Sequence, residues 1–454
     1  MKPSKFWIPG SFLFFAGLFL FLLIPQANAA SAKFTPTLEL GYHWNNNIMA
    51  TDPDQIDSIS VQWADYLVGL NGMVKSKNIT LSLGGDAGYS QAVSSTKDLE
   101  RLVKNSVSNL SYLNADLIAG FDYTNPRLEF SLTDAFKRNR TFSDIFGIQN
   151  SDFSNFYLYD DNVATATLKW RMGAHFDALA QYSYWVTMFE KPQGDITTHY
   201  GNSYQQSGEF KLMYKINPRV SAGLDLQGGE RVYAENTQRD TLGNEIKQKV
   251  SSYTYLQELA EVDFAFDPRT SLIVAAGANQ RQFFNQGDFK LKDEDYPVAR
   301  INFIRAVKNQ YDLTLSGECG SNTYGLNEYF TYYQAGVLFD YYIRKQLHLT
   351  ADVIYKNDTF SRSSLDLEEI WAKNRVDGII IAEGGFTWDM LRKQDVPYLS
   401  LSAKYEYLDR NSNIDGKDND YEPGYGGLHY SYNTTVQSAF VQLIFNPSIL
   451  IGPR

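Results

Sequence analysis

The sequence predicts an all-β fold, a transmembrane antiparallel up-and-down β-barrel of about 18 strands (16–18), with short periplasmic turns and long extracellular loops. Three observations predict it. Many segments alternate polar and apolar residues, and short and long polar breaks follow one another in turn between these segments. Beyond the amino-terminal region, no apolar run approaches the ~20 residues that a membrane helix needs.

The composition agrees with strands that face lipid on one side only. The 454 residues include 31 Tyr, 29 Phe and one Cys, and aromatic residues make up 15% of the chain. The mean hydropathy of −0.35 argues against a bundle of membrane helices. The aromatic content and regular patterning argue against a disordered chain. In a membrane barrel only alternate residues contact lipid, and aromatic residues ring both interfaces.

The amino terminus predicts export. Lys2 and Lys5 precede a nearly continuous apolar run over residues 11–24, and Ala27 and Ala29 form a small-residue cleavage site. We therefore expect a cleavable signal peptide over residues 1–29 and a single barrel domain over residues 30–454. An uncleaved anchor helix is the alternative, but the apolar run is short for a bilayer core of ~30 Å.

The net charge limits the partners of the chain. It is −11 for the full sequence and −13 after cleavage, because residues 1–29 contain two lysines and no acidic residue. A chain this acidic lacks the basic surface that nucleic acids require. We expect outer-membrane lipid and the outer-membrane assembly machinery as partners, and no nucleic acid.

The alternation has a period of two. In residues 347–353 (LHLTADV) the apolar residues fall on one face and His348, Thr350 and Asp352 on the other. Residues 397–407 (PYLSLSAKYEY) repeat the pattern. A helix would spread the same residues around its whole surface, so these segments are predicted strands.

The breaks between the segments predict the connections. Eight short turns are expected at residues 75–77, 125–126, 171–174, 217–218, 267–268, 308–309, 344–345 and 392–396. Nine long loops are expected at residues 45–57, 91–103, 140–160, 190–203, 232–250, 285–297, 321–328, 361–375 and 410–429. These connections join about eighteen strands and leave both chain ends on the short-turn side, as in bacterial barrels.

A soluble propeller or sandwich is the alternative all-β reading. Strands in those folds are typically shorter, and many are buried on both faces. Here one face is almost uninterruptedly apolar while the other carries Asp, Glu, Lys, Ser and Gly. A polar interior with an apolar exterior is typical of a membrane barrel.

The alternation also predicts which charged residues line the interior. The predicted pore-lining residues are Asp86, Glu129, Asp225, Arg281, Asp312, Glu318, Asp352, Glu383, Lys404 and Glu406. Acidic residues outnumber basic ones in this set, which would favour cations in a narrow pore. Alternatively, these carboxylates brace the wall by pairing across strands.

The predicted loop at residues 140–160 is unusually apolar. It contains Phe142, Phe146, Phe153, Phe156 and Tyr157. Such a loop is expected to constrict the barrel, to pack over its rim, or to contact a neighbouring protomer.

A calcium-loop spacing occurs near the carboxyl terminus. Asn411, Asn413, Asp415 and Glu422 stand at the ligand positions of such a loop, with Gly416 at the bend. Ca²⁺ is therefore a candidate ligand and no other cofactor is expected. A plain solvated loop is the alternative, because no helices flank the motif.

Enzymatic activity is not expected. The five histidines lie far apart in sequence, and no nucleophile elbow, zinc-protease motif or phosphate-binding loop occurs. The single Cys319 excludes an internal disulfide.

Two short segments carry a family resemblance. Residues 35–42 (TPTLELGY) with 45–49 (NNNIM) resemble the first strand of a family of outer-membrane β-barrel porins, and residues 132–140 (LTDAFKRNR) resemble its fifth strand. Genes of that family often lie in exopolysaccharide-synthesis operons. The resemblance implies an integral outer-membrane pore for polysaccharide export or for passage of small solutes, with periplasmic polysaccharide-export components as partners. A plugged barrel that acts as an interaction or scaffold protein is the alternative, and an outer-membrane enzyme is a third.

The carboxyl terminus departs from the usual ending of outer-membrane barrels. The last alternating segment ends at Phe445, and residues 446–454 follow as a tail. We expect Phe445 to serve as the strand-terminal aromatic residue that the assembly machinery recognises.

Overall fold

The chain forms one antiparallel sheet that closes on itself. The structure is a computed structural model. It describes residues 31–46, 60–95, 111–139, 158–189, 202–234, 236–239, 245–248, 252–284, 293–324, 328–360, 374–393, 396–413, 433–447 and 449–451. The predicted signal peptide lies outside these residues, so its cleavage stays a prediction. Among the residues that the structure describes, no helix is long and apolar enough to cross a membrane.

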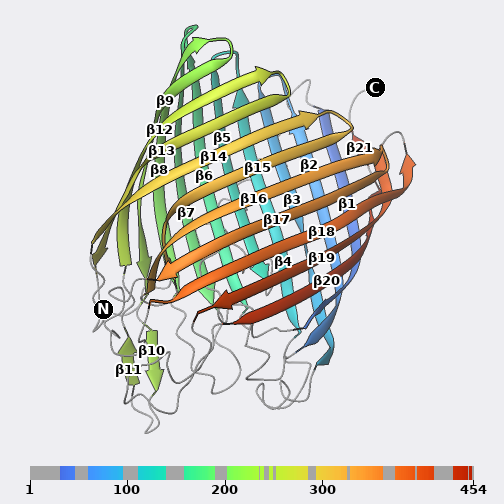
Figure 1. The fold of residues 1–454 in the computed structure, drawn as a ribbon. Coiled ribbons are helices and arrows are strands. Elements are labelled where there is room, and N and C mark those ends of the chain that lie inside the picture. Colours follow the sequence, from blue (N-terminus) through green and yellow to red (C-terminus); the bar gives the residue numbers. More distant parts are fainter. Residues whose placement is uncertain are drawn as a thin grey trace.

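Eighteen strands make up the barrel, which confirms the predicted fold class. They run from one end of the barrel to the other with a common tilt (Figure 1). The first nine are β1 (Ser31–Asn45), β2 (Val61–Lys75), β3 (Ile79–Ser95), β4 (Tyr112–Thr124), β5 (Leu128–Asn139), β6 (Tyr159–Met172), β7 (Phe176–Phe189), β8 (Ser203–Asn217) and β9 (Val220–Tyr233). The other nine are β12 (Ser252–Asp267), β13 (Thr270–Phe284), β14 (Glu294–Val307), β15 (Tyr311–Tyr324), β16 (Glu328–Arg344), β17 (Leu347–Phe360), β18 (Val376–Lys393), β19 (Val396–Ser412) and β20 (Thr434–Phe445).

Each barrel strand pairs with the strands before and after it, and the first strand pairs with the last. In the closing ladder, β1 residues 38–45 face β20 residues 438–445. Asn45 donates its side-chain amide to the Ser438 hydroxyl at 2.8 Å within this ladder. A closed sheet leaves no unpaired edge, which is a condition for strands that cross a membrane.

The eight predicted short turns all fall between consecutive strands at one end of the barrel. Three of them share an Asx-Pro-Arg sequence and one hydrogen-bond pattern. The backbone N–H of Arg127, Arg219 and Arg269 donates to the side-chain Oδ1 two residues earlier, at 2.9, 2.8 and 2.7 Å. Proline presets the backbone for a turn, and the Asx side chain then satisfies a backbone donor.

Two long connections differ from the sequence-based expectation. The expected loop 321–328 is short, because β15 continues to Tyr324 and β16 begins at Glu328. Polar residues 321–323 remain in register with Tyr329, Phe330 and Thr331, so the ladder extends further than hydropathy indicates. The expected loop 232–250 contains a small separate hairpin of β10 (Asn236–Arg239) and β11 (Glu245–Gln248).

The carboxyl-terminal tail also differs from the expectation. A short strand, β21 (Ile449–Ile451), pairs with residues 32–34 of β1 and continues the ladder that β20 begins. Phe445 ends β20, and its ring packs edge-on against Tyr398 with the ring centroids 4.7 Å apart.

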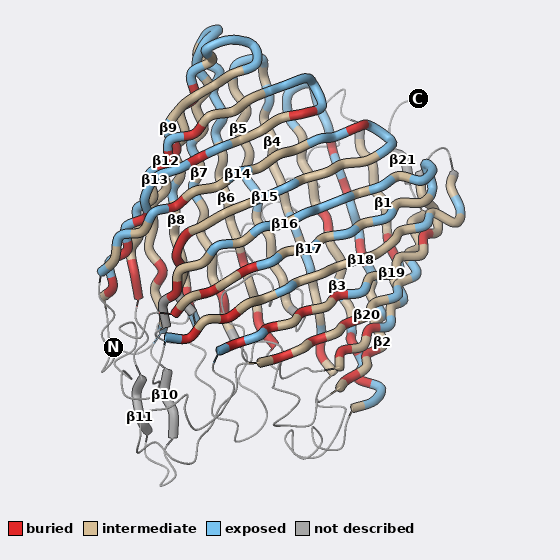
Figure 2. The backbone as a smooth tube through the Cα atoms, viewed as in Figure 1, coloured by how far each residue is buried: buried red, intermediate tan, exposed pale blue. Residues whose placement is uncertain are grey.

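The two faces of the barrel wall differ as the alternation predicts. On β9, Leu224 and Leu226 are 58% and 39% exposed, whereas Asp225 between them is fully buried. Figure 2 shows the same alternation of burial along the barrel strands. The exposed face carries apolar and aromatic side chains, as lipid contact requires, and the opposite face lines the interior.

Candidate functional site: the inner wall of the barrel

The inner wall consists of the inward-facing side chains of the eighteen barrel strands. All ten predicted pore-lining residues lie on this face, opposite the exposed apolar side chains of their own strands. Glu383, Lys404 and Glu406 come together, with Lys404 Nζ at 2.8 Å from Glu383 Oε2 and 2.6 Å from Glu406 Oε1. Asp352 is the cross-strand neighbour of Glu383. Glu129 forms an exposed ion pair with Arg171 at 3.0 Å near the short turns.

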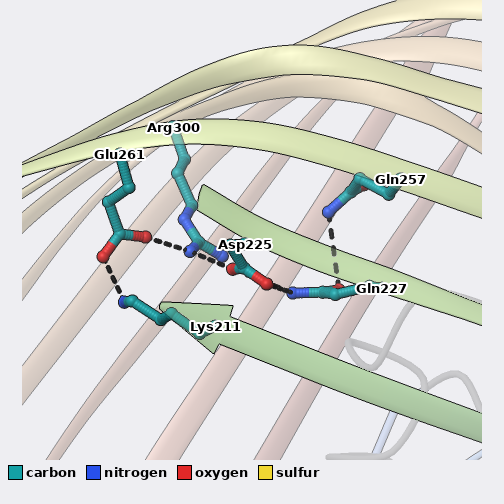
Figure 3. Close-up of polar contacts among 6 residues, drawn as sticks. All are labelled: Lys211, Asp225, Gln227, Gln257, Glu261 and Arg300. Carbon is teal, nitrogen blue, oxygen red and sulfur yellow. Dashed lines mark hydrogen bonds and ion pairs between the residues drawn. The ribbon is translucent and has the colours of Figure 1, made fainter. Parts of the chain in front are cut away.

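Asp225 belongs to a larger charged group that the sequence analysis did not identify. The group, here named the arginine network, consists of Lys211 on β8, Asp225 on β9, Glu261 on β12 and Arg300 on β14 (Figure 3). Arg300 donates to Asp225 Oδ2 at 2.9 Å and to Glu261 Oε2 at 2.6 Å. Lys211 donates to the other oxygen of Glu261. Both carboxylate side chains are fully buried, so two cations compensate two buried anions.

Small residues leave the space through which Arg300 reaches its partners. Ala275 on β13 lies in register between Arg300 and Glu261, and Gly223 on β9 lies opposite Glu261. Ala275 is 1% exposed. A larger inward side chain at either position would fill the path of the guanidinium group.

Amide side chains extend the arginine network toward the long-loop end of the barrel. Gln227 donates to Asp225 Oδ2 at 3.2 Å, Gln257 donates to Gln227 Oε1 at 3.4 Å, and Asn279 donates to Gln257 Oε1 at 3.2 Å. These contacts join the three strands β9, β12 and β13, so this part of the wall is held by side chains as well as by backbone pairing.

Two further arginines lie against aromatic rings of the inner wall. Arg231 is stacked 5.2 Å from the Trp185 ring centroid and 5.1 Å from that of Tyr233. Arg281, a predicted pore-lining residue, lies 4.7 Å from the Tyr253 ring centroid and donates to the Ser321 carbonyl at 3.4 Å. Both arginines are at most 5% exposed. Alternation could have identified Arg231 and Arg300, since each stands between residues of the outer face.

Two histidines pair with carboxylates on the inner wall. His43 Nδ1 lies 2.6 Å from Asp65 Oδ2, and His348 Nε2 lies 3.3 Å from Asp340 Oδ1. Ser90 lies beside Asp65 and accepts from the Asn114 side-chain amide at 2.7 Å. In a Ser-His-Asp triad the imidazole lies between the hydroxyl and the carboxylate, whereas here the carboxylate lies between the other two. This arrangement cannot activate Ser90 as a nucleophile.

The candidate calcium ligands are only partly described. Asn411 lies in β19, opposite Gly378. Asn413 accepts the backbone N–H of Val376 at 2.8 Å and donates to the Asn374 carbonyl at 2.8 Å, which joins the ends of β18 and β19. Asp415 and Glu422 lie outside the described residues, as do the candidate constriction residues Phe142, Phe146, Phe153, Phe156 and Tyr157. Both hypotheses therefore stay predictions.

The closed barrel with an apolar outer surface and a charged inner wall is that of an integral outer-membrane β-barrel protein. No family model matches the chain, and no curated protein sequence matches it. Solved structures are similar to it at low identity. OccAB2 of Acinetobacter baumannii shares 10% identity, with 92% of this chain and 98% of that chain covered and a TM-score of 0.45.

Two other solved structures show the same level of similarity. The outer membrane protein OpdK of Pseudomonas aeruginosa shares 10% identity over 92% of this chain and 99% of its own, with a TM-score of 0.44. A BenF-like porin of Pseudomonas fluorescens Pf-5 shares 8% identity over 92% and 99%, also with a TM-score of 0.44. The strand pairing of this chain itself, in which β1 pairs with β20, defines the closed barrel.

Proposed function

We propose that the chain forms a passive, porin-like diffusion channel across the outer membrane. The observation that carries the proposal is a set of like-charged neighbours on the inner wall. Asp86 faces Asp116, Asp312 faces Asp340, and Asp352 faces Glu383 across adjacent strands. Like charges directly opposite one another destabilise a sheet, and charges without water are costly to bury. Water and mobile cations in an open lumen would relieve both costs.

The same pairs support a preference for cations. Carboxylates that line a narrow aqueous path raise the local concentration of cations and exclude anions. Part of the acidic excess is neutralised, because Lys404 contacts both Glu383 and Glu406 and Arg300 contacts Asp225 and Glu261. The carboxylates that make no ion pair with a described residue, Asp86, Asp116, Asp312 and Asp352, would therefore set the selectivity.

The proposed solutes are small cations and neutral saccharides. Export of a neutral or mixed polysaccharide, with periplasmic export components as partners, is supported by the resemblance of residues 35–49 and 132–140 to the exopolysaccharide-associated porins. A strongly anionic polymer would be repelled by the inner wall. We propose no catalytic step.

One observation favours the second candidate, a barrel that does not conduct and serves as a scaffold. Phe330, Phe360 and Arg375 lie near the long-loop ends of β16, β17 and β18 and are at most 1% exposed. These three side chains are shielded from water. A closed section here would block an otherwise wet lumen.

Single-channel recording tests the proposal. The refolded protein is inserted into a planar bilayer, and the reversal potential is measured under a KCl gradient. We expect steady openings with cation preference, and a weaker preference in the double variant Asp312→Asn/Asp352→Asn. Glu258→Gln is the matched control, because Glu258 is exposed on the outer face of β12. No openings from folded protein would contradict the channel and favour the scaffold.

A further inference from the structure

One pocket in the inner wall is lined by several acidic side chains and a histidine. It lies where β20, β1, β2, β3 and β4 meet, has a volume of about 230 Å³, and is here named the His43 pocket. Its polar lining includes Glu39, His43, Asp65, Asp86, Asn114 and Asp116. The volume is below the ~300–1,000 Å³ of pockets for drug-sized ligands, so the pocket fits a group of a few atoms.

The backbone creates this hollow where a strand carries no side chain. Gly41 on β1 faces Asp65 on β2. A Cβ atom at Gly41 would lie 3.3 Å from Asp65 Cβ and 3.4 Å from its Oδ2. The missing side chain lets the Asp65 carboxylate lie over β1 and meet His43, two residues further along that strand.

His43 is the buried group that points to a ligand. The residue is 4% exposed, and its ring stacks on Trp63 and Phe440 with centroids 4.5 and 5.3 Å away. Nδ1 donates to Asp65 Oδ2 at 2.6 Å, so in the neutral ring the lone pair lies on Nε2. Among the described residues Nε2 has no hydrogen-bond partner, and the second Asp65 oxygen has none either.

The remaining polar groups of the pocket are also acceptors. Asp86 and Asp116 are cross-strand neighbours that make no ion pair with any described residue, and Glu39 accepts from Gln442. Lys137 on β5 is the cross-strand neighbour of Asp116 but does not line the pocket. The described residues contain no cluster with the geometry to hold a metal ion. The missing partner is therefore a cationic group that only donates hydrogen bonds.

We propose that the His43 pocket is a binding subsite for the primary ammonium group of a small organic cation that passes through the barrel. An ammonium group carries three donors and no acceptor, so it matches Nε2 of His43 and the carboxylates of Asp86 and Asp116. The rings of Tyr112 and Phe440 offer apolar contact to the carbon stem of the solute. The inference deepens the proposed channel function, on which it rests, by naming a class of solute.

Binding is measured by titration calorimetry on the folded, detergent-solubilised protein, with 1,4-diaminobutane as the probe and 1,4-butanediol as its neutral analogue. We expect binding of the diamine only. The variant Asp86→Asn/Asp116→Asn should weaken it at least about tenfold, because two charge-assisted hydrogen bonds are lost. Glu258→Gln/Asp295→Asn removes two exposed carboxylates of β12 and β14 that do not line the pocket, and it should leave the affinity unchanged.

Equal affinity in the two double variants, or no binding by the wild-type protein, would overturn the subsite. If Asp86→Asn/Asp116→Asn does not fold, His43→Phe removes the free acceptor without changing the acidic charge, and unchanged affinity of that variant overturns the proposal. Single-channel recording in KCl without diamine distinguishes a failure of the channel proposal from a failure of the subsite proposal. A silent barrel that binds the diamine contradicts only the channel, and a conducting barrel that does not bind it contradicts only the subsite.

Discussion

Arg300 shows how one side chain can hold four strands together. It extends from β14 across Ala275 of β13 to carboxylates on β12 and β9. Because Asp225 and Glu261 are fully buried, their charges depend on Arg300 and Lys211 for compensation. Removing one partner from a buried ion pair leaves an uncompensated charge, which costs more than the pair itself contributes.

Arg300→Met should therefore lower the free energy of unfolding by about 3–5 kcal/mol. Urea-induced unfolding in lipid vesicles, followed by tryptophan fluorescence, measures the change. Arg305→Met is the matched control, since Arg305 lies on the same strand but is exposed on the outer face. The control should change stability by less than about 0.5 kcal/mol. Equal effects of the two substitutions would mean that the arginine network does not stabilise the barrel.

The sequence predicts the face on which a side chain lies but not its partner. Alternation placed Asp225 on the inner wall, and it applies equally to Lys211, Glu261 and Arg300. Their contact depends on the register of β8, β9, β12, β13 and β14, which no local pattern encodes. The His43 pocket depends in the same way on Gly41 facing Asp65 across two strands.

The strands and turns themselves could be predicted closely from the sequence. The eight short turns were identified because Asn, Asp, Pro, Gly and Lys interrupt the alternation, and three carry a side-chain cap of their own. Strand ends were harder to place. Residues 321–323 are polar, yet they stay paired with β16, because the backbone hydrogen bonds of the ladder do not depend on the hydropathy of the side chains.

Glycines within strands give a sharp test of how closely the strands pack. A Cβ atom at Gly277 on β13 would lie 1.7 Å from the carbonyl oxygen of Glu258 on β12, so the two backbones would have to separate. Gly384 on β18 has no atom within 4 Å of such a Cβ. Gly277→Ala should lower the free energy of unfolding by about 1–3 kcal/mol or prevent folding, and Gly384→Ala should change it by less than about 0.5 kcal/mol.

Heat-modifiable migration on gels and urea titration would measure both glycine variants. A Gly277→Ala barrel as stable as Gly384→Ala would show that β12 and β13 can separate locally at no cost. Such a result would contradict the tight pairing seen between residues 252–267 and 270–284.

The molecule as a whole has the reverse of a soluble protein's hydrophobic pattern. Trp170 and Trp388 are 50% and 45% exposed on the outer face, near the short-turn ends of β6 and β18. Trp63 is inward and fully buried. Aromatic side chains at such a position are typical of the interfacial girdle that borders an apolar band of ~25 Å.

Quenching by brominated phospholipids tests this orientation. In variants that keep a single tryptophan, we expect strong quenching for Trp170 and Trp388 and almost none for Trp63, because bromine quenches only on contact. Bromine near the headgroup should quench the two exposed residues more than bromine at the chain end. Strong quenching of Trp63 would mean that the assignment of inner and outer faces is wrong.

The ladder between β1 and β20 has a consequence for the order of events in folding. Asn45 meets Ser438 across 393 positions of the chain and Glu39 meets Gln442 across 403, so the first strand is synthesised long before its last partner. Contacts of such high sequence separation form slowly. Until Phe445 and the rest of β20 are available, β1 has an unpaired edge that can pair with another strand. A chaperone that covers this edge would favour closure of the barrel over aggregation.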